Sequence, residues 1–117
     1  MVNQSRQSAI PDVVRGDVWL VALDPTIGSE IQKTRPSLIV SPAEMNDRLR
    51  TVVAAPMTTG SRPAPSRIPV RFQDRAGLIL LDQLRAVDKS RLIRRLGTVR
   101  PDTLATTLAI LREIFEE

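Results

Sequence analysis

Short runs of β-branched and apolar residues, each closed by proline, glycine or a charged residue, follow one another along most of this chain. The longest, Val13–Leu23, Arg35–Ser41 and Arg50–Thr59, have the length and composition of buried strands. Such close spacing predicts a strand-rich fold with short connections. We expect further short strands at residues 66–72, 77–81, 83–87 and 94–99.

Proline and glycine mark the breaks between these runs. Pro36 lies near the start of a run, where a strand tolerates proline, whereas Pro56 inside a run suggests a bulge or a sheet edge. The segment Gly60–Pro65 is a loop by composition. We also expect loops or helical turns at residues 26–34, 42–48 and 89–92.

A helical pattern occurs at the C-terminal end. Leu104, Leu108, Leu111 and Phe115 recur at helical spacing and make one apolar face. The segment Pro101–Phe115 begins with proline, which suits the first position of a helix. Many short strands followed by one helix predict a mainly β fold, a strongly bent sheet or small barrel with a C-terminal helix.

The length of 117 residues corresponds to one small domain, which we place at residues 13–117. Residues 1–12 are polar without a hydrophobic period, and we expect a flexible arm there. No apolar run approaches the roughly 20 residues of a membrane span. The N-terminus lacks a signal-peptide pattern, so we expect a cytoplasmic protein with no membrane partner.

The chain contains no histidine and no cysteine. This excludes disulfides and thiolate metal sites, and removes the commonest general acid–base and metal ligand. We therefore expect no zinc and no other cofactor. A carboxylate-bound magnesium ion stays conceivable, although no isolated acidic pair lies close in sequence. Catalysis must use arginine, lysine, carboxylate or hydroxyl side chains, since tyrosine is absent too.

The positive charge is concentrated in the middle and the second half of the chain. The net charge is +4, and from Arg48 to Arg75 six arginines stand against one acid. Such a balance favours a polyanionic partner, although a solvated arginine-rich surface is the alternative. Aromatic residues are scarce, so RNA binding by ring stacking is disfavoured. We expect Trp19, on the first strand, to lie in the core or in a dimer interface.

Five segments of the chain form an ordered set. They are RGDVWLVALDPTIGSE (15–30), RPSLIVSP (35–42, followed by Asn46), VVAAPMTTGS (52–61), GLILLDQLRAVDKSRL (77–92) and GTVRPDTLATTLAIL (97–111). Each segment alone is a weak signal, but chance is a poor explanation for five in register. In this order and spacing they resemble the MazF/PemK/Kid toxin family.

The resemblance implies an SH3-like β-barrel with a C-terminal helix, of the CcdB/PemK type, working as a homodimer. Members of the family are toxins of toxin–antitoxin pairs. They cut single-stranded RNA at short sequences without a metal, and a cognate, MazE-like antitoxin neutralises them. The family's catalytic arginine and threonine correspond to Arg35 and Thr58. We therefore expect an endoribonuclease that cuts messenger RNA and inhibits translation.

This chemistry is consistent with the residues present. Without a metal or a histidine, the nucleophile is the RNA's own 2′-hydroxyl, and the products are a 2′,3′-cyclic phosphate and a 5′-hydroxyl. A guanidinium such as that of Arg35 suits the charge of the pentavalent intermediate. A hydroxyl such as that of Thr58 can hydrogen-bond a non-bridging oxygen. Taken alone, each residue also fits an ordinary place at a strand.

Six further residues are candidates for substrate binding. Glu30 could act as the base, orient Arg35 or contact a nucleobase, although a solvated loop carboxylate is the alternative. Asp82 and Gln83 match the family's Asp-Gln pair, with hydrogen bonding inside the barrel as the alternative. The full set is Ser29, Glu30, Thr59, Arg62, Asp82 and Gln83. Arg67, which like Arg62 lies in or beside the loop after the third predicted strand, is a possible phosphate contact.

The sequence departs from the Kid branch of the family at two positions. Kid-type members use the aspartate of the Asp-Gln segment together with an arginine two positions earlier, where this chain has Leu80. They also carry a histidine where this chain has Ser29. The Kid-type catalytic set is therefore broken, whereas the arginine–threonine set is intact.

Two other classes of function remain open at this stage. CcdB toxins share the fold yet bind DNA gyrase and cleave nothing, in which case Arg35 and Thr58 would be incidental. A nucleic-acid-binding barrel with no enzymatic role is the other. The Arg-Pro and Pro-x-Thr-Thr segments resemble those of the nuclease branch and favour the nuclease.

Overall fold

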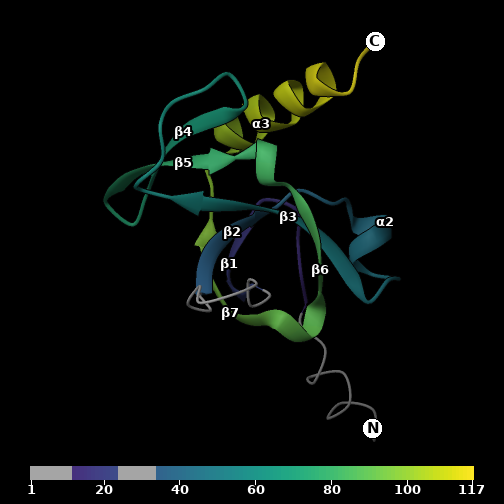
Figure 1. The fold of residues 1–117 in the computed structure, drawn as a ribbon. Coiled ribbons are helices and arrows are strands. Elements are labelled where there is room, and N and C mark those ends of the chain that lie inside the picture. Colours follow the sequence, from purple (N-terminus) through teal and green to yellow (C-terminus); the bar gives the residue numbers. More distant parts are fainter. Residues whose placement is uncertain (1–11, 24–33) are drawn as a thin grey trace, which may run out of the picture.

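The computed structural model describes residues 12–23 and 34–117. These residues form one antiparallel sheet that curls around on itself, with a helix across one opening (Figure 1). The strands are β1 (Asp17–Ala22), β2 (Thr34–Ile39), β3 (Thr51–Thr58), β4 (Arg67–Phe72), β5 (Arg75–Leu80), β6 (Arg85–Asp88) and β7 (Leu92–Thr98). The helices are α2 (Ala43–Asn46), the 3₁₀ turns η1 (Leu81–Gln83) and η2 (Lys89–Arg91), and α3 (Pro101–Ile114).

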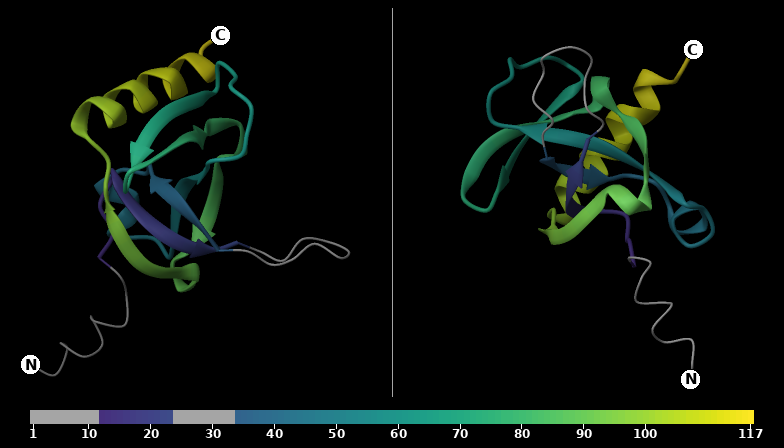
Figure 2. Two further views of the ribbon diagram at one scale, coloured as in Figure 1. Left: turned by 90° about the vertical axis from the view of Figure 1, so that its left-hand side faces the viewer. Right: turned by 60° about the horizontal axis from the view of Figure 1, so that its bottom comes forward.

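The expected fold class, mainly β with a C-terminal helix, is confirmed. The strand order is β4-β5-β3-β2-β1-β7, and β6 pairs with β3 beside β5. Strand β3 therefore has three partners. Residues 51–54 pair with β6, residues 57–58 pair with β5, and residues 54–56 pair with β2 along the opposite edge. The sheet is strongly curled, as the views in Figure 2 show.

Pro56 lies inside the sheet, which corrects the expectation of a bulge or a sheet edge. The amide of Val40 donates to the carbonyl of Val53, so the polar groups of Val53 and Ala55 point toward β2. Backbone alternation directs the ring nitrogen of Pro56 to the other edge. There Pro56 falls between Ala54, the last residue paired with β6, and Met57, the first paired with β5. Its missing N–H therefore costs no ladder hydrogen bond.

Apolar side chains fill both faces of the curled sheet. Along β1, Val18 belongs to a cluster that packs against α3, whereas Trp19 and Val21 belong to a second cluster on the opposite face. This period-two alternation is what a strand buried on both sides requires. Trp19 has 8% of its surface exposed, which confirms the prediction of a core position.

Helix α3 covers the first of these clusters. Leu104, Leu108 and Leu111 pack against it, as their spacing predicts. Phe115 does not: the helix ends at Ile114, and Phe115 follows it with a side chain that is 74% exposed. The predicted apolar face is thus correct for three of its four residues. Within the described ranges, no helix has the length and apolar character to cross a membrane.

Several strand boundaries differ from the predicted ones. The first strand begins at Asp17 rather than Val13, because the Asp17 amide donates to the Val14 carbonyl in a turn that needs Gly16 at φ +98°. Leu81–Gln83 form a 3₁₀ turn, so the following strand begins two residues later than expected, at Arg85. The predicted helical turns near residues 42–48 and 89–92 are confirmed.

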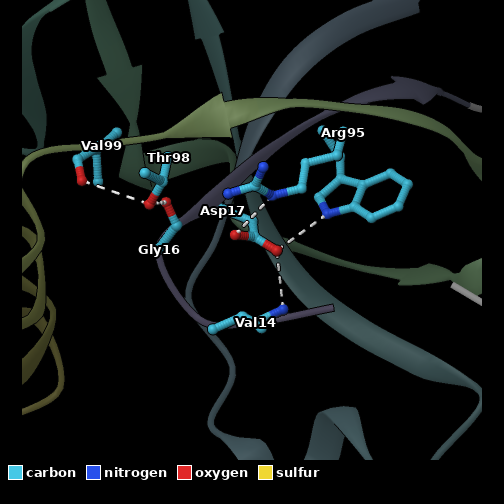
Figure 3. A network of polar contacts seen from close by, with 7 residues as sticks. Val14, Gly16, Asp17, Arg95, Thr98 and Val99 are labelled. Carbon is cyan, nitrogen blue, oxygen red and sulfur yellow. Dashed lines mark hydrogen bonds and ion pairs between the residues drawn. The ribbon is translucent and has the colours of Figure 1, made fainter. Parts of the chain in front are cut away.

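A buried carboxylate holds this N-terminal turn to the edge of the sheet (Figure 3). Asp17, which is 4% exposed, accepts hydrogen bonds from the Val14 amide at 3.0 Å and from Arg95 Nε at 3.1 Å. The indole N–H of Trp19 donates to it at 3.4 Å. Nearby, the Thr98 hydroxyl donates to the Gly16 carbonyl at 3.0 Å. The segment before β1 is thereby joined to β7.

Replacing this carboxylate by an amide is expected to destabilise the protein. In Asp17→Asn, an N–H₂ group replaces one of the acceptor oxygens, so at least one of the three donors loses its acceptor and the buried N–H₂ group faces a donor, at a cost of about 1–3 kcal/mol. Urea unfolding measures the loss. The control is Asp102→Asn, whose exposed ion pair with Arg100 is solvated and is expected to leave the midpoint unchanged. Equal midpoints for wild type and Asp17→Asn would contradict this role.

Candidate active site

Arg35 and Thr58 lie 23 positions apart in the chain and meet in the folded protein. Arg35 is the second residue of β2, and Thr58 is the last residue of β3, the strand beside it. Arg35 Nη1 lies 3.4 Å from Thr58 Oγ1 and donates to it. The antiparallel register pairs Ser37 with Pro56, and continuing it by two residues places Arg35 across from Thr58. The predicted pair is therefore brought together by strand pairing.

The Thr58 hydroxyl is held from two sides. Besides the bond from Arg35, Thr58 Oγ1 accepts a hydrogen bond of 3.1 Å from the Gly60 amide. A hydroxyl has two acceptor sites and one donor proton. With both acceptor sites used, the proton points away from these partners. Within residues 12–23 and 34–117, no acceptor is recorded for that proton, so it is available to an incoming oxygen.

The pair opens onto a pocket with a volume of about 250 Å³. Its wall comes from the start of β2, the end of β3 and the β4–β5 hairpin. The lining residues are Thr34, Arg35, Pro36, Met57, Thr58, Thr59, Val70, Phe72, Gln73, Arg75, Gly77 and Leu78. Within the described part of the chain, this lining includes two arginines and no carboxylate. Such a pocket favours an anion, and its apolar wall suits a sugar or a base attached to that anion.

Gly77 allows β5 to lie close to the end of β3. A Cβ atom at this position would be 2.6 Å from the Thr58 carbonyl oxygen, which is shorter than real Cβ contacts. Because the obstacle is backbone, neither partner could move aside without shifting a strand. The glycine thereby permits the Thr58–Leu78 pairing and sets the position of the threonine.

Asp82 lies outside the pocket lining and ties down the loop between β3 and β4. Its carboxylate accepts hydrogen bonds from Arg67 Nε at 3.1 Å and Nη2 at 3.0 Å, and one from the Ser66 hydroxyl at 3.3 Å. Arg67 Nη1 also donates to the Arg62 carbonyl at 3.0 Å. Asp82 is exposed, so its predicted role in substrate binding stays a prediction beside this role in the loop. The same bonds engage the Arg67 guanidinium, which we gave as a possible phosphate contact.

The β4–β5 hairpin contributes residues that the sequence analysis missed. Phe72, Gln73 and Arg75 line the pocket, and Arg75 pairs with Phe72 across a two-residue turn. Gln73 and Asp74 both have positive φ, 53° and 65°, as the turns that suit tight hairpins require. The signal was the alternation of Val70 and Phe72, which extends across such a turn to Arg75. No element was predicted for residues 73–76, between two predicted strands, so the alternation was not extended to Arg75.

A family model described as the PemK-like, MazF-like toxin of type II toxin–antitoxin systems matches residues 14–115. This chain belongs to that family. Endoribonuclease PemK of Escherichia coli is 40% identical over 102 residues, covering 80% of this chain and 74% of that protein. Endoribonuclease toxin MazF of Escherichia coli K12 is 34% identical over 96 residues, covering 81% and 85%.

Solved structures of PemK/MazF-like toxins share the fold. The MazE–MazF crystal structure (Form-II) from Deinococcus radiodurans has a TM-score of 0.75 at 27% identity, covering 90% of this chain and 95% of that one. An endoribonuclease in complex with its cognate antitoxin from a mycobacterial species has a TM-score of 0.72 at 27% identity, covering 87% and 93%. The resemblance inferred from the five segments is confirmed.

Family membership makes the departures from the Kid branch structurally interpretable. Leu80 is 4% exposed and contributes to the apolar interior, so the position of the Kid-type arginine is occupied here by a core side chain. Of the other predicted substrate contacts, Thr59 lines the pocket, whereas Arg62, Asp82 and Gln83 lie outside its lining. Ser29 and Glu30 lie outside the described residues, as does the expected N-terminal arm up to residue 11.

The Asp82–Arg67 ion pair is expected to loosen in acid. Hydrogen bonds from Arg67 lower the pKa of Asp82 below its ordinary value, so the pair is fully formed above the unfolded pKa near 4 and is lost as pH falls through the folded value. We expect faster exchange of the Arg67 amide, which donates to the Ala64 carbonyl, as the pair breaks.

Hydrogen exchange followed by NMR measures this loosening across a pH series. In Asp82→Asn, the protection factor of the Arg67 amide, which is its exchange rate compared with the intrinsic rate, should already be low at neutral pH. It should not fall further in acid. Asp102→Asn, which breaks an ion pair on α3, serves as the control and should behave as wild type. Equal protection in Asp82→Asn and wild type would show that the ion pair does not hold the loop.

Proposed function

We propose that this family member is a metal-independent endoribonuclease toxin. It cuts single-stranded RNA at short sequences by attack of the RNA's own 2′-hydroxyl, leaving a 2′,3′-cyclic phosphate and a 5′-hydroxyl. The observation that carries the proposal is the contact between Arg35 and Thr58 at a pocket whose described lining holds two arginines and no acid. The similar relatives named as endoribonucleases support the same activity.

The geometry of the pair suits a phosphorane intermediate. As the 2′-oxygen attacks phosphorus, negative charge grows on the non-bridging oxygens. The guanidinium of Arg35 supplies fixed donors to that charge, and the free proton of the Thr58 hydroxyl adds one more. Because both groups are positioned by paired strands, little reorganisation is needed when the charge develops. Each donor of this kind is worth on the order of 100- to 1,000-fold in rate.

Two proton transfers complete the reaction. The bond from phosphorus to the 5′-oxygen breaks as the 2′-oxygen bond forms, so the 2′-hydroxyl must lose a proton and the 5′-oxygen must gain one. Arg35 is our candidate for donating to the leaving 5′-oxygen. Since the chain has no histidine, a carboxylate is the natural base, and we assign that role to Glu30.

The remaining candidate contacts surround this centre. Thr59 extends the pocket lining next to Thr58 and is proposed to hydrogen-bond the substrate. Arg62 belongs to the loop that Arg67 and Asp82 hold in place, and its exposed side chain is proposed to meet an RNA phosphate. We propose substrate contacts for Ser29 and Gln83 as well.

We further propose that the chain acts in the cytoplasm as a homodimer and is neutralised by a cognate antitoxin. Solved relatives include toxin–antitoxin complexes. The net charge of +4 favours an antitoxin segment that is acidic. Such a segment, laid over the cationic pocket, would exclude RNA by occupying the same charges.

Cleavage of a long RNA in EDTA tests the proposal. Wild type should make discrete cuts, whereas Arg35→Ala and Thr58→Val should be slower by at least about 100-fold, since each loses a donor to the intermediate. The matched control is Arg48→Ala, which removes an exposed arginine in the turn after α2 and should cut as wild type.

Product chemistry distinguishes the mechanism from a metal-dependent one. A single 2′-deoxynucleotide at the cleaved position should abolish cutting, and the upstream product should carry a 2′,3′-cyclic phosphate. Complete loss of activity in EDTA, with recovery on adding magnesium, would contradict the mechanism. Cuts that persist at full rate in Arg35→Ala would keep the nuclease and remove our catalytic residue.

A further inference from the structure

The pocket carries a second arginine whose position differs from that of Arg35. Strand β3 lies between β2 and β5, so Arg35 and Arg75 approach the end of β3 from its two sides. Arg35 lies across from Thr58. Arg75 lies three residues before Leu78, the β5 partner of Thr58, which corresponds to about 10 Å along the strand. The two arginines therefore reach the pocket from strands on opposite sides of β3.

The hairpin that carries Arg75 is held in place by β7. The Gln73 side-chain amide donates to the Leu96 carbonyl at 3.4 Å. The Phe72 ring packs on the backbone of Gly97, where an added Cβ would lie 3.3 Å from the ring. The tight turn and the Phe72–Arg75 pairing then fix the direction in which the arginine leaves the strand. Arg75 is thus presented by a preorganised element.

Besides the two arginines, part of the pocket wall is apolar. Met57, Val70 and Phe72 form this part of the wall. An anion at Arg35 and a second anion at Arg75, joined by an apolar or aromatic group, would match the whole pocket. Two successive phosphates of a nucleic-acid strand, with the nucleoside between them, have this pattern. Among the described residues, no ion pair or hydrogen bond is recorded for the Arg75 side chain, so its charge is available.

We infer that Arg75 binds the phosphate adjacent to the scissile one and so positions the RNA strand along the pocket. This inference rests on the proposed nuclease function and adds a binding residue to it. Because Arg75 contacts a phosphate that does not react, its contribution is the same in the ground state and in the transition state. It therefore lowers KM and leaves kcat unchanged.

The test compares Arg75→Ala with Arg71→Ala. Arg71 is an exposed arginine on the same hairpin, but it does not line the pocket, and its guanidinium donates to the Asp74 carbonyl at 3.5 Å. On a short RNA with one cleavage site, Arg75→Ala should raise KM by roughly 10-fold at unchanged kcat, whereas Arg71→Ala should change neither. The slope of the logarithm of the binding constant against the logarithm of salt concentration should become shallower by about 0.7 for Arg75→Ala. It should not change for Arg71→Ala.

A neutral methylphosphonate at each phosphate beside the scissile one identifies the contact. When the methylphosphonate replaces the phosphate that Arg75 contacts, an RNA blocked by a 2′-deoxynucleotide should bind wild type and Arg71→Ala more weakly. The same replacement should not weaken binding to Arg75→Ala any further. This non-additivity shows that the arginine and that phosphate act together.

The outcomes separate this inference from the proposed function. If wild type makes no cuts, the nuclease itself is rejected. If wild type cuts and Arg75→Ala behaves as Arg71→Ala, the nuclease stands and the role of Arg75 is overturned. A fall in kcat at unchanged KM would place Arg75 at the reacting phosphate and would also overturn the assignment. Circular dichroism and thermal unfolding confirm that both variants fold.

Discussion

The pairing of β3 with three other strands is the constraint on which the rest of the structure depends. Its first half is bonded to β6 and its second half to β5, while β2 follows its other edge. Pro56 lies where the pairing of β3 changes from β6 to β5. Proline suits this position because it has no N–H and needs no hydrogen-bond acceptor. The sheet curls around the core that α3 covers, and the end of β3 lies between β2 and β5, which each carry an arginine of the pocket lining.

Close backbone contacts hold this end of β3 in a fixed position. Gly77 lets β5 reach the Thr58 carbonyl, and the Gly60 amide holds the hydroxyl of the same residue. The Asp82–Arg67 pair fixes the loop that follows. Backbone contacts and a neighbouring ion pair thus hold the hydrogen-bond donors in place. Donors that are already positioned stabilise developing charge without rearranging during the reaction.

Much of this arrangement was predictable from the sequence, and the exceptions have physical causes. Strand alternation and helical spacing located the core and most elements, and the segment order identified the family. Phe115 was misplaced because spacing alone cannot show that a helix stops one residue early. Arg75 was missed because its place in the pocket lining depends on the turn at Gln73 and Asp74, and glutamine is uncommon at a positive φ. Both errors concern conformations that tertiary contacts decide.

A site made of arginine and threonine has a consequence for regulation. Arg35 and Arg75 both line the pocket, and the described part of its lining holds no carboxylate to neutralise them. Under the proposed function, an acidic partner that covers the pocket occupies these two guanidinium groups in place of RNA.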